Sequence, residues 1–192
     1  MGLIKCAKDF LGLRACPHQF SFILVHPLRK LWLSPTRLSD RLHLSKSSLV
    51  LEIGPGPGFF SVEVAQCIPE GHLALFDIQK EMLKKVRRKL VKAELENVSF
   101  VQGDACGLPY EASVFDVAFL ITVLGEVPDA PVCLREIHRV LRTGGLLSIS
   151  EQCPDPDFIS INLVRQLTEN EGFTFIENYG RRWNFTANFR KL

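Results

Sequence analysis

Apolar and polar residues alternate on two length scales along this chain. From Leu49 onward, short apolar runs are separated by segments in which apolar residues recur every three or four positions. Buried strands joined by amphipathic helices produce this pattern, which is typical of a parallel sheet covered on both faces. The expected strands span 49–53, 72–77, 98–101, 115–121 and 146–150. The expected helices span about 59–67, 80–92, 131–141 and 159–171.

Turn residues separate several of these segments. Glycines and prolines alternate over 54–58, directly after the first expected strand, and residues 69–71 form a turn after the first helix. After the helix at 131–141, the segment 142–145 has a basic residue followed by two glycines, the composition that helix ends prefer. We therefore expect that helix to close there, before the fifth strand begins.

The end of the chain changes character. Two apolar runs at 173–177 and 183–190 flank residues 178–181, which have the composition of a turn. In the second run, apolar residues alternate with polar ones, which predicts a strand with one face buried. The short link favours an antiparallel hairpin at the edge of the sheet. The whole pattern predicts an α/β fold in a single domain, a Rossmann-like doubly wound seven-stranded sheet with a C-terminal antiparallel hairpin.

The first 45 residues lie outside this alternation. Ser34, followed by proline, predicts a helix N-terminus with leucines facing the core at helical spacing. The apolar stretch 20–32 has two interpretations, a lid over the active edge of the sheet or an anchor in a membrane surface. Its proline and its shortness favour the lid. We therefore divide the chain into an N-terminal helical or lid segment, 1–45, and a second domain with the α/β alternation, 46–192.

Composition narrows the functional classes. The chain has 192 residues, 46% of them hydrophobic, and a net charge of +2 from 23 basic and 21 acidic residues. This length indicates one folded domain, and this charge is too mild to indicate a nucleic-acid partner. Seven of the thirteen residues in 80–92 are Lys or Arg. We interpret them as the solvated face of an amphipathic helix, the alternative being a nucleic-acid patch.

The compartment follows from the cysteines and the apolar stretches. Six scattered cysteines without a Cys-x-x-Cys pair disfavour a zinc site and a disulfide framework, and they fit a reducing cytoplasm. The most apolar stretch, 114–124, is too short to span a bilayer, and charges interrupt the apolar residues of 1–16. We expect a cytoplasmic protein with no metal and no transmembrane segment. Peripheral membrane contact stays open, and the oligomeric state is not indicated.

The glycine-rich turn has the features of a ligand-binding loop. Glycines let the backbone approach a ligand closely, and the helix that follows offers unpaired N–H groups. Here Glu52 precedes glycines at positions 54, 56 and 58. A dinucleotide fingerprint requires a further glycine or alanine where this chain has Phe59. The bulk of Phe59 disfavours a nicotinamide-dependent oxidoreductase.

This loop and the segments after later strands resemble the motifs of the class I S-adenosylmethionine-dependent methyltransferases. Within that family the resemblance is to the small-molecule and quinone branch. The first motif of that family, an acid before alternate glycines, resembles Val50-Leu51-Glu52-Ile53-Gly54-Pro55-Gly56-Pro57-Gly58. The later segments that resemble the family, in its order, are Leu75-Phe76-Asp77-Ile78, Gln102-Gly103-Asp104-Ala105, Phe115-Asp116-Val117-Ala118-Phe119 and Leu141-Arg142-Thr143-Gly144-Gly145-Leu146. The resemblance covers about residues 37–192.

The resemblance implies S-adenosylmethionine as the cofactor. Asp77 would accept from both ribose hydroxyls and Asp104 from the exocyclic amine of adenine, with Ile78 and Leu108 flanking the ring. The cofactor residues that it implies are Glu52, Gly54, Gly56, Gly58, Asp77, Ile78, Asp104, Ala105 and Ile121. Taken alone, Asp77 could instead cap the helix at 80–92, and Asp104 could instead shape a turn.

Methyl transfer from a sulfonium depends chiefly on alignment, and a base is needed only when the acceptor loses a proton. The sequence therefore assigns no catalytic residue. Glu126 and Glu151, after the fourth and fifth strands, are candidates for such a base, although each could instead cap a helix or solvate a loop. His26 and Tyr110 could line the acceptor pocket.

These arguments predict an S-adenosylmethionine-dependent methyltransferase that acts by in-line displacement on a small-molecule or lipid-like acceptor. The alternative is a protein of the same fold that binds the cofactor but acts as an inactive regulator or partner. The acids Glu52, Asp77 and Asp104 are all in place, which disfavours decay of the site without excluding it.

Overall fold

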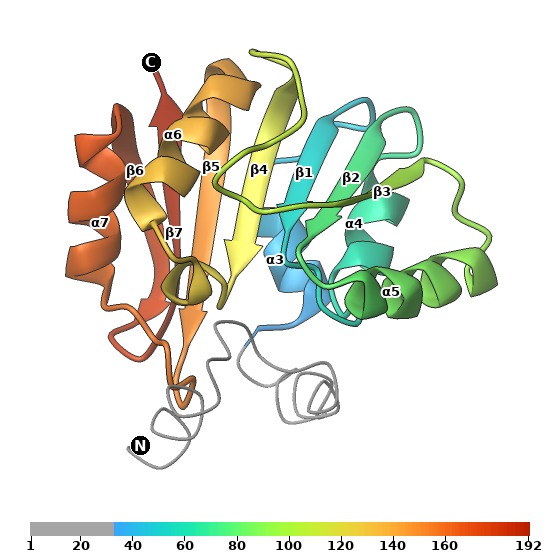
Figure 1. The fold of residues 1–192 in the computed structure, drawn as a ribbon, viewed down its shortest axis with the longest axis horizontal. Coiled ribbons are helices and arrows are strands. Elements are labelled where there is room, and N and C mark those ends of the chain that lie inside the picture. The colour runs from blue at the N-terminus through green and yellow to red at the C-terminus, as the bar shows by residue number, and fades with distance from the viewer. Residues whose placement is uncertain (1–32) are drawn as a thin grey trace.

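The computed structural model describes residues 33–192, and within them a seven-stranded sheet forms the centre of the molecule (Figure 1). Its strands are β1 (Leu49–Ile53), β2 (His72–Asp77), β3 (Val98–Gln102), β4 (Phe115–Ile121), β5 (Leu141–Gln152), β6 (Phe173–Arg181) and β7 (Asn184–Lys191). The strand order is β3-β2-β1-β4-β5-β7-β6. β1 to β5 run parallel, and β7 runs antiparallel to both β5 and β6. The predicted doubly wound sheet with a C-terminal hairpin is confirmed.

Helices cover both faces of this sheet. They are α3 (Pro35–Arg41), α4 (Ser61–Cys67), α5 (Lys80–Lys92), α6 (Ala130–Val140) and α7 (Ile161–Asn170), with a short 3-10 helix, η3 (Leu124–Glu126). α3, α4 and α5 share one core, in which Leu38, Val64 and Val86 are fully buried. α6 and α7 share the other, in which Ile137 and Val164 are fully buried. Each helix contributes one apolar stripe, so each face of the sheet has its own hydrophobic core.

Neighbouring residues of a strand belong to opposite cores, because side chains of a strand alternate between its faces. In β1, Val50 packs with the α3–α5 core, whereas Leu51 packs with the α6–α7 core. Covering both faces explains why the inner strands are continuous apolar runs in the sequence. The expected strand bounds 49–53, 72–77 and 115–121 are those of β1, β2 and β4.

The helix expected over about 131–141 forms as α6, but the prediction that residues 142–145 close it was wrong. α6 ends at Val140 and β5 begins at the next residue, because Leu141 already pairs with Phe115 at the start of β4. Residues 142–145 then bulge out of the β4–β5 ladder. Gly144 has a positive φ of 78°, which glycine adopts readily. Its role is therefore in a strand bulge rather than in a helix cap.

The C-terminal hairpin forms, but its turn and its burial differ from the prediction. Residues 178–181 belong to β6, and the turn lies at Arg182 and Trp183, with Trp183 56% exposed. The hairpin lies at the edge of the sheet, as predicted, with β6 outermost and β7 between β5 and β6. Thr186 and Asn188, which we expected on a solvated face, are consequently fully buried.

Arg41 of α3 explains how this polar face of β7 can be buried. Its Nη1 donates to Oγ1 of Thr186 at 2.7 Å, and its backbone carbonyl accepts from Nδ2 of Asn188 at 2.7 Å. Oγ of Ser150 lies 2.9 Å from Oγ1 of Thr186. Polar groups are tolerated in the interior when they are hydrogen-bonded. The alternation in the sequence therefore reflects a buried polar contact rather than solvent.

The start of α3 confirms the predicted helix N-terminus. Oγ of Ser34 accepts a hydrogen bond from the backbone N–H of Arg37, and Leu38 and Leu42 are fully buried. The apolar stretch 20–32 and His26 lie outside the described residues. Within 33–192, no helix has both the length and the apolar character that crossing a membrane requires.

Candidate functional site

The loop between β1 and α4 needs glycine for both its conformation and its packing. Gly54, Gly56 and Gly58 all have positive φ, between 53° and 74°. A Cβ on Gly54 would lie 2.5 Å from Cγ2 of Val123, and a Cβ on Gly58 would lie 2.4 Å from Cγ2 of Val86. The loop thus packs tightly against the segment after β4 on one side and against α5 on the other. No other residue type fits these positions without displacement of a neighbour.

Asp77, at the end of β2, connects the glycine loop to the start of α5. Its Oδ1 accepts from the backbone N–H of Gln79 at 2.8 Å, and its carboxylate also accepts from the backbone N–H of Gly56. Asp77 is 7% exposed, and this burial raises its pKa to about 6 against the opposing effect of the two hydrogen bonds. The position serves the helix start and the loop at the same time.

Glu52 lies beside Asp77 and is more deeply buried. It is 3% exposed, and its Oε2 has no hydrogen-bond partner. Burial raises the pKa of Glu52 to about 8; the nearby Ser61 hydroxyl acts against this shift, and the charge of Asp77 adds to it. A buried carboxyl oxygen without a hydrogen-bond partner is uncommon. A bound ligand or a water molecule would satisfy it.

The ends of β2 and β3 bring the expected adenine-side residues together. Asp77 pairs with Gln102 in the sheet, and Nε2 of Gln102 donates to the carbonyl of Ile78 at 3.2 Å. Ile78 is 54% exposed at this edge. Oδ1 of Asp104 accepts from the backbone N–H of Cys106 at 2.9 Å, so this exposed acid shapes its own turn. The turn leaves Asp104 and Ala105 at the same edge as Asp77.

Two residues that sequence reasoning placed near ligands pack in or against the α6–α7 core. Leu108 is 4% exposed within that core. Tyr110 packs edge-on against Phe76 and Phe115, with ring centroids 6.2 and 5.0 Å apart. Burial raises the pKa of Tyr110 to about 12. Its ring fills the space between two core phenylalanines, and its hydroxyl is buried without a hydrogen-bond partner.

β4 ends at Ile121, which is 8% exposed and packs with the α3–α5 core. The next residue, Thr122, has a positive φ of 55°, an uncommon conformation for a β-branched side chain. Its backbone N–H donates to the carbonyl of Ser150 at 2.8 Å, which ties the ends of β4 and β5 together. Backbone strain of this kind is concentrated at functional sites.

The two candidate bases lie near the carboxyl ends of β4 and β5. Glu126 ends η3, and Glu151 is the penultimate residue of β5, where it is 1% exposed. The charge of Glu126 acts on Glu151, as do those of Asp155 and Asp157 in the following loop. Sequence reasoning missed these two aspartates. The alternation of proline and aspartate directly after a strand end was the available signal.

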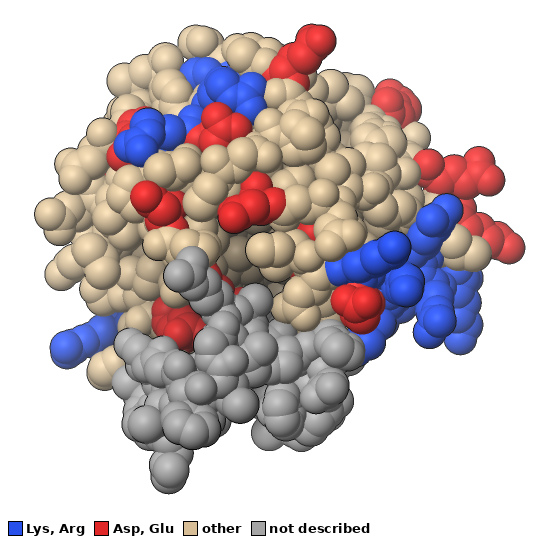
Figure 2. All heavy atoms as spheres, in the orientation of Figure 1, with Lys and Arg blue, Asp and Glu red and all other residues tan. Residues whose placement is uncertain are grey.

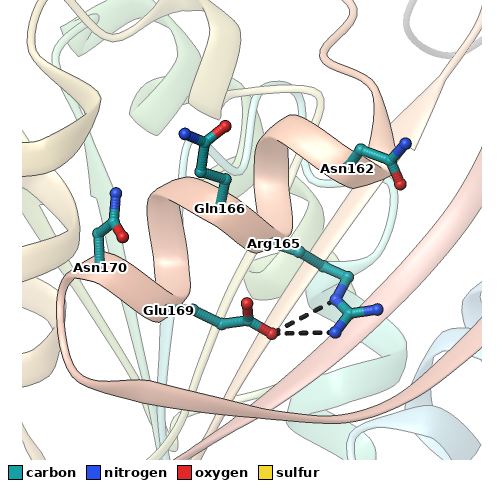
Figure 3. Close-up of a pocket in the computed structure, with 5 residues that line it drawn as sticks. All are labelled: Asn162, Arg165, Gln166, Glu169 and Asn170. Atoms are coloured by element: carbon teal, nitrogen blue, oxygen red, sulfur yellow. Dashed lines mark hydrogen bonds and ion pairs between the residues drawn. The ribbon is translucent and has the colours of Figure 1, made fainter.

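Two surface features lie away from this edge. A hollow on the outer side of α7 is lined by five polar residues of that helix, and the ion pair of Arg165 and Glu169 crosses it (Figure 3). The Lys and Arg side chains of α5 gather at the lower right of the face in Figure 2. Figure 1 shows β4 and β5 ending at the lower edge, between these two helices. The glycine loop and the acids therefore share one edge of the sheet, its carboxyl edge, as expected for ligands of open α/β sheets.

Known proteins are similar to this chain in sequence and in fold. A family model described as a methyltransferase domain matches residues 44–179. The demethylmenaquinone methyltransferase of Listeria monocytogenes is 37% identical over 108 residues, which are 56% of this chain, and that of Staphylococcus aureus is 32% identical over 112 residues, which are 58%. The chain spans about half the length of these relatives, 46% of each.

A crystal structure of an S-adenosylmethionine-dependent methyltransferase from Aquifex aeolicus has the same fold. It superposes with a TM-score of 0.86 at 20% identity and covers 93% of this chain and 100% of that chain. The match of the family model extends over more than half of the sequence and includes the glycine loop, Asp77 and Asp104. The chain therefore belongs to the methyltransferase domain family, the class I methyltransferases whose cofactor is S-adenosylmethionine.

Proposed function

We propose that the protein transfers a methyl group from S-adenosylmethionine to a small-molecule or lipid-like acceptor by in-line displacement. The observation that carries this proposal is the buried acidic pair, Glu52 and Asp77, packed beneath a loop with three glycines of positive φ. A nucleoside with a cationic tail fits such a site, because it offers hydroxyls to one acid and positive charge near the other.

The residues present fit this cofactor. Asp77 would accept from the ribose hydroxyls, and the three positive-φ glycines would let the backbone of the loop approach the cofactor closely. Oε2 of Glu52, which lacks a partner, fits a site next to a cationic group. Ile78, Ala105 and Asp104 would contact adenine. When bound, the cofactor supplies a methyl group already activated by the positive charge of its sulfur.

The main contribution of the protein to the reaction is then to align the acceptor with the methyl group. Holding a nucleophile in line with the methyl group removes about 7–11 kcal/mol from such a barrier. The strained turn at Thr122 and the short helix η3 lie where the ends of β4 and β5 meet, so they would form one wall of the acceptor site. A base is required only for an acceptor that loses a proton on attack.

An apolar ring acceptor is favoured over a nucleic acid. The two curated relatives reported above are both demethylmenaquinone methyltransferases, enzymes named for a quinone. The net charge of this chain, +2, gives little attraction to a phosphate backbone. We therefore propose quinone-type compounds as the first class of methyl acceptors to screen with this protein. Cytoplasmic location and contact with a membrane surface, where such acceptors reside, are parts of the same proposal.

Calorimetric titration with S-adenosylmethionine, S-adenosylhomocysteine and NAD tests the proposal. We expect micromolar binding of both sulfur compounds and none of NAD. Incubation with methyl-labelled cofactor and reduced naphthoquinones then tests turnover. Binding without transfer to any acceptor would favour the alternative, an inactive regulator of the same fold. Binding of NAD alone would contradict both.

A further inference from the structure

Glu151 is a buried carboxyl group whose hydrogen bonding is incomplete. It stands at the carboxyl end of β5, opposite Phe185 in the sheet, and is 1% exposed. The backbone N–H of Ile159 donates to the carboxylate, whereas Oε1 has no partner. Sheet geometry alone does not require an acid here, and leaving a buried acceptor unpaired destabilises the fold. An unpaired oxygen of this kind fits a proton or a donor supplied from outside the chain.

The surroundings of Glu151 are acidic on both sides. Asp155 and Asp157 act on it from the loop after β5, and Glu126 acts on it from η3. The charges that act most strongly on Glu151 are thus all carboxylates. Together with burial, which is the larger effect, they raise its pKa to about 8. At neutral pH the isolated protein holds a proton on this group.

Close packing connects this acid to the cofactor loop. A Cβ on Gly125 would lie 1.9 Å from the carbonyl oxygen of Asp157, so η3 and the loop after β5 are in direct contact. Two residues earlier, the side chain of Val123 packs on Gly54 of the glycine loop. The segment 123–126 therefore packs against the glycine loop at one end and, at the other, against the loop whose aspartates act on Glu151.

We propose that Oε1 of Glu151 is the base that takes the proton from a hydroxyl acceptor during methyl transfer; this inference rests on the proposed function. As the oxygen–methyl bond forms, the methyl–sulfur bond breaks and its electron pair stays on sulfur. The acceptor O–H bond breaks, and its proton moves to Oε1. The sulfonium thereby becomes a neutral thioether and Glu151 a neutral acid.

The ionisation of Glu151 then follows the charge of the cofactor. A positive sulfur nearby favours the carboxylate, so Glu151 releases a proton to water when S-adenosylmethionine binds. S-adenosylhomocysteine has the same nucleoside and amino acid but no positive sulfur, so it leaves the proton in place. In the proposed site, Glu52 and Asp77 would face the groups that both ligands share, and they would therefore contribute equally to both titrations.

Proton release on binding is the first measurement. The wild-type protein is titrated with each sulfur compound at pH 7 in two buffers of different ionisation enthalpy. We expect S-adenosylmethionine to release up to about one proton more than S-adenosylhomocysteine. In Glu151→Gln this difference should vanish while both compounds still bind. Glu169→Gln, on the outer side of α7 (Figure 3), is the matched control and should keep the wild-type difference.

Turnover is the second measurement. A panel of phenols, naphthols and reduced naphthoquinones serves as hydroxyl acceptors. Glu151→Gln should lower the transfer rate by about 10²–10⁴-fold and abolish its rise with pH, with little change in the KM for the cofactor. An unaltered rate, or a proton difference that persists in Glu151→Gln, would overturn the assignment of Glu151. If the wild-type protein binds neither sulfur compound, the proposed function itself fails.

Discussion

The backbone N–H of Gly56 donates a hydrogen bond to the carboxylate of Asp77, joining the loop after β1 to the end of β2. Asp77 also accepts from Gln79 at the start of α5, so one acid holds two segments in position. This arrangement places a buried carboxylate directly beside a loop that can approach a ligand closely. The hydrogen bond from Gln79 supports the interpretation of Asp77 as part of the helix start, and the same buried carboxylate is our candidate for the ribose site.

Replacing Asp77 should weaken cofactor binding more than it weakens the fold. Asp77→Ala removes the acceptor for both ribose hydroxyls, and hydrogen bonds to a charged group contribute about 1.5–3 kcal/mol each. We expect the Kd for S-adenosylhomocysteine to rise at least about 100-fold, as measured by calorimetry. Asp40→Ala, an exposed acid on α3, is the control. Equal affinity in Asp77→Ala and wild type would remove Asp77 from the site.

Adding one methyl group at Gly54 should disturb the loop. Its φ is +68°, and the new Cβ would lie 2.5 Å from Val123. We expect Gly54→Ala to lower the free energy of unfolding by about 1–3 kcal/mol and to abolish measurable cofactor binding. Urea unfolding measures the first effect and calorimetry the second. Gly107→Ala is matched, because a Cβ there meets nothing within 4 Å, and it should leave both quantities unchanged.

The raised pKa of Glu52 predicts how stability depends on pH. Its ordinary value of 4.5 applies to the unfolded chain, and its value in the folded protein is about 8. The folded state holds the proton more tightly, so stability falls as pH rises through this window, by an amount of the order of 3 kcal/mol. Glu52→Gln should therefore show a flatter decline and exceed the wild type in stability at pH 8.

Urea unfolding at several pH values between 4.5 and 8, the window set by Glu52, measures this effect. Some decline should remain in Glu52→Gln, because Asp77 and Glu151 also have raised pKa values. Glu70→Gln, an exposed acid, serves as the control and should follow the wild type. Parallel curves for Glu52→Gln and the wild type would show that Glu52 ionises normally in the fold.

The buried polar contact of α3 and β7 should matter for stability and not for binding. Thr186→Val keeps the shape of the side chain but removes the acceptor for Arg41 and the partner of Ser150. Leaving a buried donor unpaired destabilises a protein by about 1–3 kcal/mol. Urea unfolding of Thr186→Val should show this loss. Thr174→Val, at an exposed position of β6, should show almost none.

The local sequence pattern was sufficient to predict those elements whose burial follows from their own residues. The bounds of β1, β2, β4 and α5 agree with the prediction. The apolar run of β1 ends at a glycine and that of β2 at an acid, and α5 has a regular apolar stripe. The glycine loop and Asp77 were also predictable, since both follow strand ends. Parallel strands bring such ends to one edge of a sheet.

Only the tertiary structure decided features that depend on residues distant in sequence. Leu141 became a strand residue because Phe115 pairs with it, and Thr186 became buried because Arg41 of α3 covers it. Tyr110 packs into a core that the sequence does not reveal.

The acids around Glu151 show the same difference between what the sequence predicts and what only the fold decides. The sequence by itself determined most of the strands and helices and the position of the glycine loop, because short-range periodicity specifies buried strands and helices. The tertiary structure decided that Glu126, Glu151, Asp155 and Asp157 share one neighbourhood. The physical reason is that Gly125 and Asp157 come into contact, although they are distant in sequence and belong to segments that only the folded sheet brings together.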